Sequence, residues 1–154
     1  MSEPVNIHEK FPAGGQALAR IEIAVRKSGL PSSTIELVKT RSSQINGCAF
    51  CLDMHHKDAR AAGETEERLY MLNAWREATC YTEEERAALA LTEAITMISE
   101  AHVPAEVEDE ARKHYSDELY AALVFAIIAI NSWNRAAIAS HSEPGLYQPG
   151  QFDQ

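Results

Sequence analysis

Apolar residues along most of the chain recur at the three- and four-residue spacing of an α-helix, and short segments rich in Gly, Pro, Ser and Thr separate these stretches. No stretch alternates polar and apolar positions for long enough to predict a strand. The pattern predicts an all-α fold of six to eight helices. The expected helices cover residues 16–27, 33–46, 48–62, 65–75, 82–100, 104–115 and 116–140.

Several of these helices carry recognisable end signals. Thr82 followed by Glu85 has the spacing of a capping box, and Gly63 is well placed to end the 48–62 helix. Ser33 followed by Glu36 has the same capping-box spacing. This second box would explain Glu36 by local structure alone, without any part in catalysis.

The chain length of 154 residues fits a single domain over residues 1–154, with its core in about residues 18–145. Residues 146–154 are rich in Pro and Gly, and we expect them to form an extended tail. The longest apolar run, Leu119–Ile130, is too short to span a bilayer and predicts a buried helix. Because residues 121–130 are apolar nearly all round, a neighbouring subunit is expected to help cover this helix.

The net charge of −9 and the sequence pI near 5.1 argue against nucleic acid or an anionic membrane surface as partners, because both require clustered Lys and Arg. The first residues, MSEPVNIHEK, lack the basic and then apolar segments of a signal peptide. We therefore expect a cytoplasmic protein, in a compartment where stable disulfides are uncommon. A close pair of cysteines there indicates redox chemistry or metal binding.

Such a pair occurs in the segment INGCAFCLDMHH, which contains Cys48, Cys51 and His55. On a helix that turns by about 100° per residue, all three side chains share one face, and Cys51 and His55 can touch. Both sulfurs lie in the first turn, where free N–H groups and the helix dipole favour a thiolate. A second cysteine can then close a disulfide, while a histidine takes up or delivers the proton.

Three interpretations of this segment compete. Cys48 and Cys51 cycle between dithiol and disulfide; or the two sulfurs and His55 bind zinc; or all three side chains only pack in the core. The zinc interpretation lacks the second ligand pair that a structural site would show, and a c-type haem site is excluded because Leu52 follows Cys51. Redox cycling is therefore favoured. A thioredoxin fold is not, because the βαβ pattern is missing.

The chain resembles the alkyl hydroperoxidase D-like (AhpD-like) group of the carboxymuconolactone decarboxylase superfamily. The stretches that carry the resemblance extend over most of the chain from Leu18 to Gly145. They are IELVKTRSSQINGCAFCLDMHHKDARAAGET, LNAWREATCYTEEERAALALTEAIT and INSWNRAAIASHSEPG. The resemblance implies an all-α fold that works as a homo-oligomer, commonly a trimer or a hexamer.

The resemblance also implies roles for individual residues. Cys51 matches the peroxidatic thiol, and Cys48 matches the resolving thiol, which is the more exposed one in the family. His55 matches the histidine of the family's proton relay, and Glu36 its acidic member. Some peroxidase members carry a further histidine where this chain has Phe50, a departure that bears on the relay and on the rate of peroxide turnover.

The activity implied is thiol-dependent reduction of organic hydroperoxides in antioxidant defence, with no metal, haem or flavin cofactor. A dithiol protein of lipoyl, thioredoxin-like or glutaredoxin-like type would regenerate the Cys48–Cys51 pair. Two alternatives remain: a thiol–disulfide exchange or redox-sensing protein with little peroxidase activity, and a metal-binding or structural oligomer. The decarboxylase members of the superfamily lack the cysteine pair, so that activity is not expected.

Five further residues are expected to have supporting roles. His56 points about 100° away from His55 and is expected at a surface or an interface. Cys80 lies outside the motif and is expected to be passive. Trp133, Asn134 and Arg135 match the family pattern near the C-terminus; we expect them to hold the last helix against the active-site helices, with a contact to a thiolate or carboxylate as an alternative for Arg135.

Overall fold

The computed structural model describes residues 4–152, and within this range it contains nine α-helices, one 3₁₀ helix and no strand. This confirms the all-α prediction. The helices are α1 Ile7–Lys10, α2 Pro12–Arg26, α3 Ser32–Asn46, α4 Ala49–Ala61, α5 Glu66–Met71, the 3₁₀ helix Leu72–Ala74, α6 Glu83–Thr96, α7 Ile98–Ala101, α8 Ala105–His114 and α9 Asp117–Ala139.

The helix count exceeds the predicted six to eight because of two single-turn pieces. The one-turn helix α1 precedes the first helix that the sequence predicted. The predicted helix 82–100 is divided at Met97, whose backbone leaves the helical region with φ −102° and ψ 33°, so α7 is separate from α6. The remaining boundaries agree with the predicted ranges to within a few residues, except that α2 begins earlier, at Pro12.

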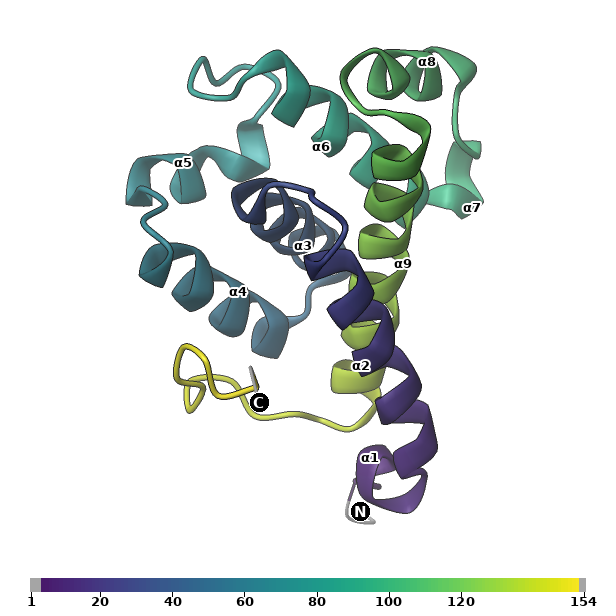
Figure 1. Ribbon diagram of the computed structural model, residues 1–154. Helices are drawn as coiled ribbons and strands as arrows, with labels where there is room; N and C mark the ends of the chain where they lie inside the picture. The colour runs from purple at the N-terminus through teal and green to yellow at the C-terminus, as the bar shows by residue number, and fades with distance from the viewer. Residues whose placement is uncertain (1–3, 153–154) are drawn as a thin grey trace.

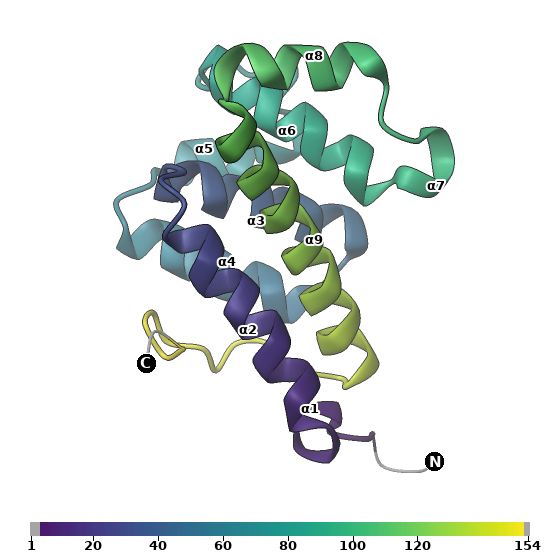
Figure 2. The same cartoon turned by 45° about the vertical axis from the view of Figure 1, so that its right-hand side comes forward.

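Helix α3 lies in the middle of the structure, with α4, α6 and α9 packed around it (Figure 1). Helices α2 and α9 run side by side, and α8 lies along α6 (Figures 1 and 2). The largest apolar cluster fills the space between α2, α3, α6 and α9, and Val38, Leu91, Leu123 and Ile127 are among its fully buried members. This packing leaves α3 with little contact with solvent.

Helix α3 is nevertheless polar along much of its buried length. Lys39 is 1% exposed and pairs with Glu22 of α2, while Ser42 hydrogen-bonds Thr96 of α6 at 3.0 Å. Since a buried polar group is costly unless it has a partner, each of these contacts fixes a neighbouring helix at a particular position on α3.

Two glycines separate α3 from α4 and α4 from α5. Gly47 has φ +68° and Gly63 has φ +97°, and nothing lies close to the position of a side chain at either. The left-handed backbone rather than crowding therefore requires glycine there. Gly47 turns the chain sharply, so that α4 starts two residues later and packs back along α3.

The two predicted capping boxes have different outcomes. The Thr82 box is present, with reciprocal hydrogen bonds between Thr82 and Glu85. The Ser33 box is wrong: α3 begins at Ser32 after Pro31, without any side-chain cap. Glu36 does not cap α3. Its carboxylate contacts a histidine on α4 instead.

Helix α9 has 23 residues and is long and apolar enough to cross a membrane by length and composition alone. The apolar run Leu119–Ile130 was predicted to be too short, but the helix continues to Ala139. Its contacts with α2, α3, α6 and α4 cover part of the helix, and 44% of its most apolar window is buried inside the structure.

After α9 the chain forms no helix up to residue 152 and passes along α4 (Figure 1). Lys57 of α4 donates to the carbonyl oxygens of Gly145 and Tyr147, and Asp53 accepts from the Gly145 amide at 2.9 Å. The tail is thus fixed to the helix that carries the cysteines. Its last two residues, 153–154, lie outside the described range.

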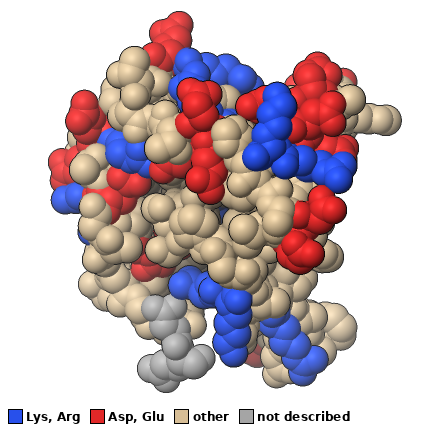
Figure 3. Space-filling model, turned by 45° about the horizontal axis from the view of Figure 1, so that its top comes forward, with Lys and Arg blue, Asp and Glu red and all other residues tan. Residues whose placement is uncertain are grey.

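One face of the surface, shown in Figure 3, carries charged side chains of both signs around a broad uncharged area. Acidic and basic groups are mixed along the upper part of this view, whereas the charged groups at its lower edge are mainly basic. The predicted lack of a nucleic-acid partner stays a prediction.

The buried carboxylate of Glu93 connects α6 to α3 and to the segment that follows the 3₁₀ helix. It accepts hydrogen bonds from Trp75 Nε1 at 2.8 Å, Arg41 Nε at 2.9 Å and Arg76 Nη2 at 2.7 Å. Burial opposes its ionisation, but these three donors together hold the pKa of Glu93 below its ordinary value of 4.5. The charge is therefore retained at neutral pH.

We expect Glu93→Ala to lower the free energy of unfolding by about 3 kcal/mol, because it leaves two guanidinium groups and the Trp75 N–H without their buried acceptor. Urea unfolding measures this, with Glu83→Ala, an exposed change in the first turn of α6, as the control. Since the folded pKa of Glu93 is lowered, the wild-type advantage should shrink as pH falls through that pKa. Equal losses in the two variants would contradict this assignment.

Candidate active site

The two cysteines of the CxxC motif lie at the start of α4, as predicted. Cys48 is the N-cap residue, and its Sγ accepts the backbone N–H of Cys51 at 3.4 Å. The left-handed turn at Gly47 places Cys48 in this position, one residue before the helix begins. The free N–H groups of the first turn thus face the sulfurs, as a thiolate site requires.

Both thiols are buried, each with 1% of its surface exposed. The expectation that Cys48 is the more exposed of the two stays a prediction, because these exposed fractions are equal. Phe50 of α4 and Trp133, Ile130 and Ala137 of α9 cover the sulfurs. A reactant can reach either sulfur only after some of these covering side chains move.

Trp133 is itself in contact with the N-terminal helix. The ring of His8 on α1 lies 5.6 Å from the Trp133 ring, centroid to centroid. The dithiol is therefore covered by Phe50 of the motif and Trp133 of α9, and His8 near the N-terminus packs against Trp133.

The two thiols share one proton unequally. The hydrogen bond from the Cys51 thiol, followed by the backbone N–H of Cys51, lowers the pKa of Cys48 to about 6 in spite of burial. The same hydrogen bond, together with burial, raises the pKa of Cys51. The reduced pair thus carries one thiolate near neutral pH, centred on Cys48, with the remaining proton on Cys51.

Asn134 supports this pair from α9. Its side chain is completely buried, accepts from Asn46 at 2.8 Å and donates to Ser43 at 2.9 Å. Hydrogen bonding by Asn134 also lowers the pKa of both thiols. The sequence reading gave Asn134 a structural role only; its signal was a polar amide in the most apolar helix, where a buried partner is needed.

His55 and Glu36 form the second part of the site. His55 Nδ1 lies 2.9 Å from Glu36 Oε2, and the two residues are 3% and 7% exposed. Burial would raise the pKa of Glu36, but the hydrogen bond and charge of His55, with smaller effects of Lys39 and Arg26, hold it below 4.5. The structure thus brings together the two predicted relay residues, with His55 one turn after Cys51 on α4.

Cys48, Cys51 and His55, the set in the alternative zinc interpretation, do not form a metal-binding group among the described residues. Within residues 4–152, the His, Cys, Asp and Glu side chains that are close enough to share an ion are Glu36, His55 and Asp58. Their ligand atoms lie within 4.8 Å of one another, and the group contains no sulfur. The two cysteines are therefore not part of the group of side chains that could share a metal ion.

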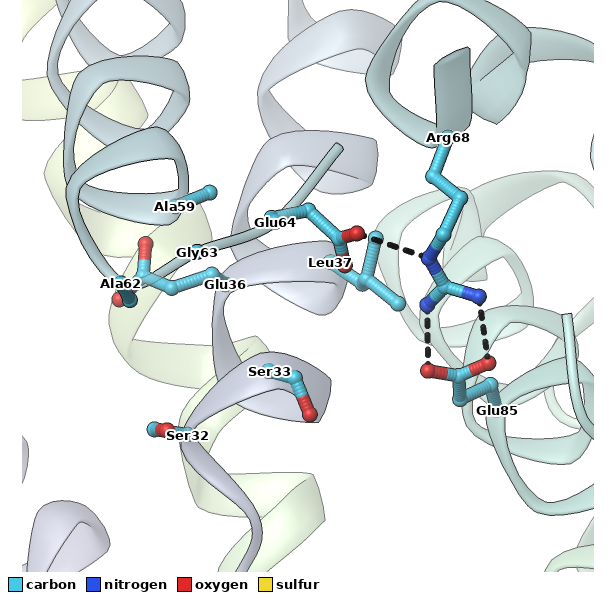
Figure 4. Close-up of a pocket in the computed structure, with 10 residues that line it drawn as sticks. All are labelled: Ser32, Ser33, Glu36, Leu37, Ala59, Ala62, Gly63, Glu64, Arg68 and Glu85. Carbon is cyan, nitrogen blue, oxygen red and sulfur yellow. Dashed lines mark hydrogen bonds and ion pairs between the residues drawn. The ribbon is translucent and has the colours of Figure 1, made fainter. Parts of the chain in front are cut away.

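A cavity of about 290 Å³ opens beside Glu36 (Figure 4). Ser32, Ser33 and Glu36 line it from α3, and Ala59 and Ala62 from α4. On its far side, Figure 4 shows the guanidinium of Arg68 held by Glu64 and Glu85, at 2.9 Å and 2.5 Å. Neither cysteine lines the cavity, so it gives access to the Glu36 side of the relay rather than to the sulfurs.

The remaining predicted residues have the following places. His56 is half-buried, and burial and the charge of His55 lower its pKa. Cys80 is half-buried away from the motif, and its carbonyl accepts from Arg68. Arg135 bonds to the Asn131 carbonyl on its own helix at 2.8 Å, while Trp133 packs on the dithiol.

Comparisons with known proteins agree with this arrangement. A family model described as the carboxymuconolactone decarboxylase family matches residues 12–94, more than half of the chain. The chain belongs to this family. The uncharacterized protein YdfG of Bacillus subtilis (strain 168) is 48% identical over 139 residues, which cover 90% of this chain and 95% of YdfG.

Two solved structures share the fold of this chain. The crystal structure of a protein of unknown function from Agrobacterium tumefaciens, named as a candidate AhpD antioxidant-defence protein, superposes with a TM-score of 0.89. That protein is 39% identical, and the match covers 95% of this chain and all of that one. The debrominase Bmp8 has a TM-score of 0.80 at 24% identity, with 93% of this chain and 78% of Bmp8 covered. This chain is accordingly an AhpD-like member of the carboxymuconolactone decarboxylase family.

We expect the reduced protein to ionise one thiol with a midpoint near pH 6, because the hydrogen bond from Cys51 stabilises the Cys48 thiolate. Since this pKa is lowered, about nine-tenths of Cys48 is then thiolate at pH 7. Ultraviolet absorbance of the thiolate, followed against pH in a Cys80→Ser background, measures the midpoint. Cys51→Ala should move it up, and a wild-type midpoint near that of free cysteine, about 8.5, would contradict the assignment.

Proposed function

We propose that this protein reduces organic hydroperoxides through a Cys48–Cys51 dithiol/disulfide cycle, with Glu36 and His55 as its proton relay. The observation that carries the proposal is the pair itself: two free thiols at a helix N-terminus, where the backbone N–H of Cys51 donates to Cys48 Sγ at 3.4 Å. Hydrogen bonding from Cys51 also lowers the pKa of Cys48. The 2.9 Å contact between His55 and Glu36 supports the relay.

The first step is attack of a Cys51 thiolate on the terminal oxygen of the hydroperoxide. The proton of Cys51 passes across its hydrogen bond to Cys48, which leaves the attacking charge on Cys51. The O–O bond breaks, Cys51 becomes a sulfenic acid, and the departing alkoxide takes a proton through His55 and leaves as an alcohol.

In the second step Cys48 attacks the sulfur of the sulfenic acid. The Cys48–Cys51 disulfide forms and hydroxide leaves as water after taking up a proton, so one hydroperoxide and two thiols give one alcohol, one water and one disulfide. A dithiol protein of lipoyl, thioredoxin-like or glutaredoxin-like type then reduces the disulfide. The cycle needs no metal, haem or flavin.

The order of the two sulfurs is open to direct test, because electrostatics and family resemblance emphasise different ones. The charge of the resting pair is centred on Cys48, whereas the resemblance assigns the attack to Cys51. We retain Cys51 as the attacking sulfur because it lies one turn from His55, which can return the proton.

The relatives support the chemical class rather than a particular substrate. The Agrobacterium tumefaciens protein at 39% identity is named for antioxidant defence, in agreement with a peroxide substrate. Bmp8 at 24% identity shares the fold, and its debrominase activity is not carried over to this chain.

We expect metal-free, reduced protein mixed with one equivalent of cumene hydroperoxide to lose two thiols into a Cys48–Cys51 disulfide while an equal amount of alcohol forms. Thiol counting, peptide mass mapping and alcohol analysis follow the reaction. Cys48→Ser should stop at a sulfenic acid on Cys51, and Cys51→Ser should consume no peroxide. Cys80→Ser is the matched control and should behave as wild type.

One outcome would overturn the proposal, and another would reverse the roles of the two cysteines within it. If the thiols survive the peroxide but exchange rapidly with an oxidised dithiol, the protein is a disulfide exchanger or redox sensor. If Cys51→Ser retains wild-type consumption and the sulfenic acid forms on Cys48, the cycle stands with the two roles reversed.

We propose further that the protein is a homo-oligomer, a trimer or a hexamer, in which a second copy covers part of α9. Phe125 and Ile128 of α9 are 52% and 39% exposed, although they belong to the most apolar helix. Beside Phe125, an apolar groove of about 340 Å³ is lined by Ile21 and Ala24 of α2 and Ala122 of α9. A contiguous apolar surface of this kind favours burial against another subunit.

We expect Phe125→Asp to convert the wild-type oligomer into a species with fewer subunits. The reason is that the substitution places a charge where apolar contact between subunits is needed. Sedimentation velocity measures the change. Phe11→Asp, which alters an exposed aromatic residue between α1 and α2, is the control and should leave the assembly intact. A wild-type monomer, or an oligomer insensitive to Phe125→Asp, would contradict this interface.

A further inference from the structure

The sequence assigned no role to the C-terminal tail, yet the tail places a buried tyrosine beside the relay. Tyr147 is 5% exposed, although the segment that carries it forms no helix. Its hydroxyl donates to Asp58 Oδ1 at 2.7 Å, the short length of a charge-assisted hydrogen bond. Asp58 lies three residues after His55 on α4, and therefore on the same side of that helix.

The Asp58 carboxylate in turn adjoins the relay. One carboxylate oxygen of Asp58, one carboxylate oxygen of Glu36 and one ring nitrogen of His55 all lie within 4.8 Å of one another. Two carboxylates and one imidazole at this separation influence each other's protonation, since like charges oppose and unlike charges favour ionisation. The position and the charge of Asp58 therefore bear on every proton that the relay moves.

Independent contacts hold Tyr147 in place. Lys57 Nζ donates to its carbonyl oxygen at 3.0 Å, and the Phe152 ring stacks on its own ring at 5.6 Å between centroids. Neither contact involves the hydroxyl. Removal of the hydroxyl alone should thus leave the tail docked on α4, which makes the hydrogen bond separately testable.

We propose that Tyr147 is a positioning residue, whose hydroxyl holds the Asp58 carboxylate beside the imidazole of His55. The C-terminal tail is then part of the active site rather than an appendage. The inference rests on the proposed relay of Glu36 and His55, and it adds Asp58 as a third charged member that the tail controls.

Other charges that act on this cluster come from several helices and must be held constant in any test. Lys39 of α3 and Arg26 of α2 act on Glu36, and His55 acts on His56. Asp53 and Lys57, which lie five residues and one residue before Asp58 on α4, pair with each other at 2.8 Å. The substitutions below leave all of these groups unchanged.

We expect Tyr147→Phe to slow peroxide-driven disulfide formation about threefold to tenfold at pH 7, the scale of one lost hydrogen bond. The pH midpoint of the reaction should rise, because a carboxylate without its donor opposes thiolate formation more strongly. Asp58→Asn should move the midpoint the opposite way, since it removes that negative charge. The double variant should match Asp58→Asn, because the proposal has the hydroxyl act on the relay through the carboxylate.

Tyr70→Phe is the matched control, because the exposed Tyr70 hydroxyl donates to Glu66 at 2.9 Å in a similar tyrosine–carboxylate bond on α5. It should change neither the rate nor the midpoint. A Tyr147→Phe protein that behaves like Tyr70→Phe, or effects of Tyr147→Phe and Asp58→Asn that simply multiply, would overturn the inference. Stoichiometric zinc binding that Asp58→Asn abolishes would overturn it too, by showing that the cluster is a metal site.

Alkylation of the reduced dithiol by iodoacetamide across pH provides a readout that does not depend on peroxidase activity. If the wild type consumes no hydroperoxide but Tyr147→Phe still shifts the alkylation profile, the peroxidase proposal fails and the positioning role stands. If the wild type is an active peroxidase and Tyr147→Phe changes neither profile, the positioning role alone fails.

Discussion

The contact between Glu36 and His55 is the constraint on which the rest of the site depends. A carboxylate that is only 7% exposed needs a buried partner, and a histidine on α4 provides it at 2.9 Å. This bond fixes the rotation and height of α4 against α3. Because both cysteines precede His55 on the same helix, the bond also determines where the sulfurs lie.

The polar interior of α3 follows the same logic. Lys39 with Glu22, Ser42 with Thr96, and Ser43 with Asn134 each tie α3 to a different helix. Such contacts add little net stability compared with apolar packing, but each has a narrow geometry. They orient α2, α6 and α9 around α3, so the dithiol is held at the junction of α3, α4 and α9.

The dithiol and the relay have different surroundings. The sulfurs lie under apolar side chains of α9 and the motif, which keep water away and make the Cys48–Cys51 hydrogen bond decisive for where the charge resides. Glu36 instead borders a cavity, and Asp58 reaches the docked tail. The proposed relay therefore borders a cavity toward the C-terminal end of α4, whereas the dithiol is buried at its N-terminal end.

Local signals were sufficient for much of this protein. Helical periodicity, the Thr82 capping box and Gly63 after α4 predicted the all-α fold and most helix ends. The spacing of the motif placed Cys48, Cys51 and His55 on one face of one helix, since that follows from helix geometry alone. The family resemblance added Glu36, which spacing could explain equally well as a cap.

Tertiary structure decided the remainder, because it depends on contacts between residues far apart in the chain. Only the packing of α3 on α4 turns Glu36 from a capping residue into the partner of His55. Only α9 brings Asn134 to the thiols, and only the docked tail brings Tyr147 to Asp58. A local pattern records which face a side chain occupies, whereas the neighbour on that face is determined when the helices pack.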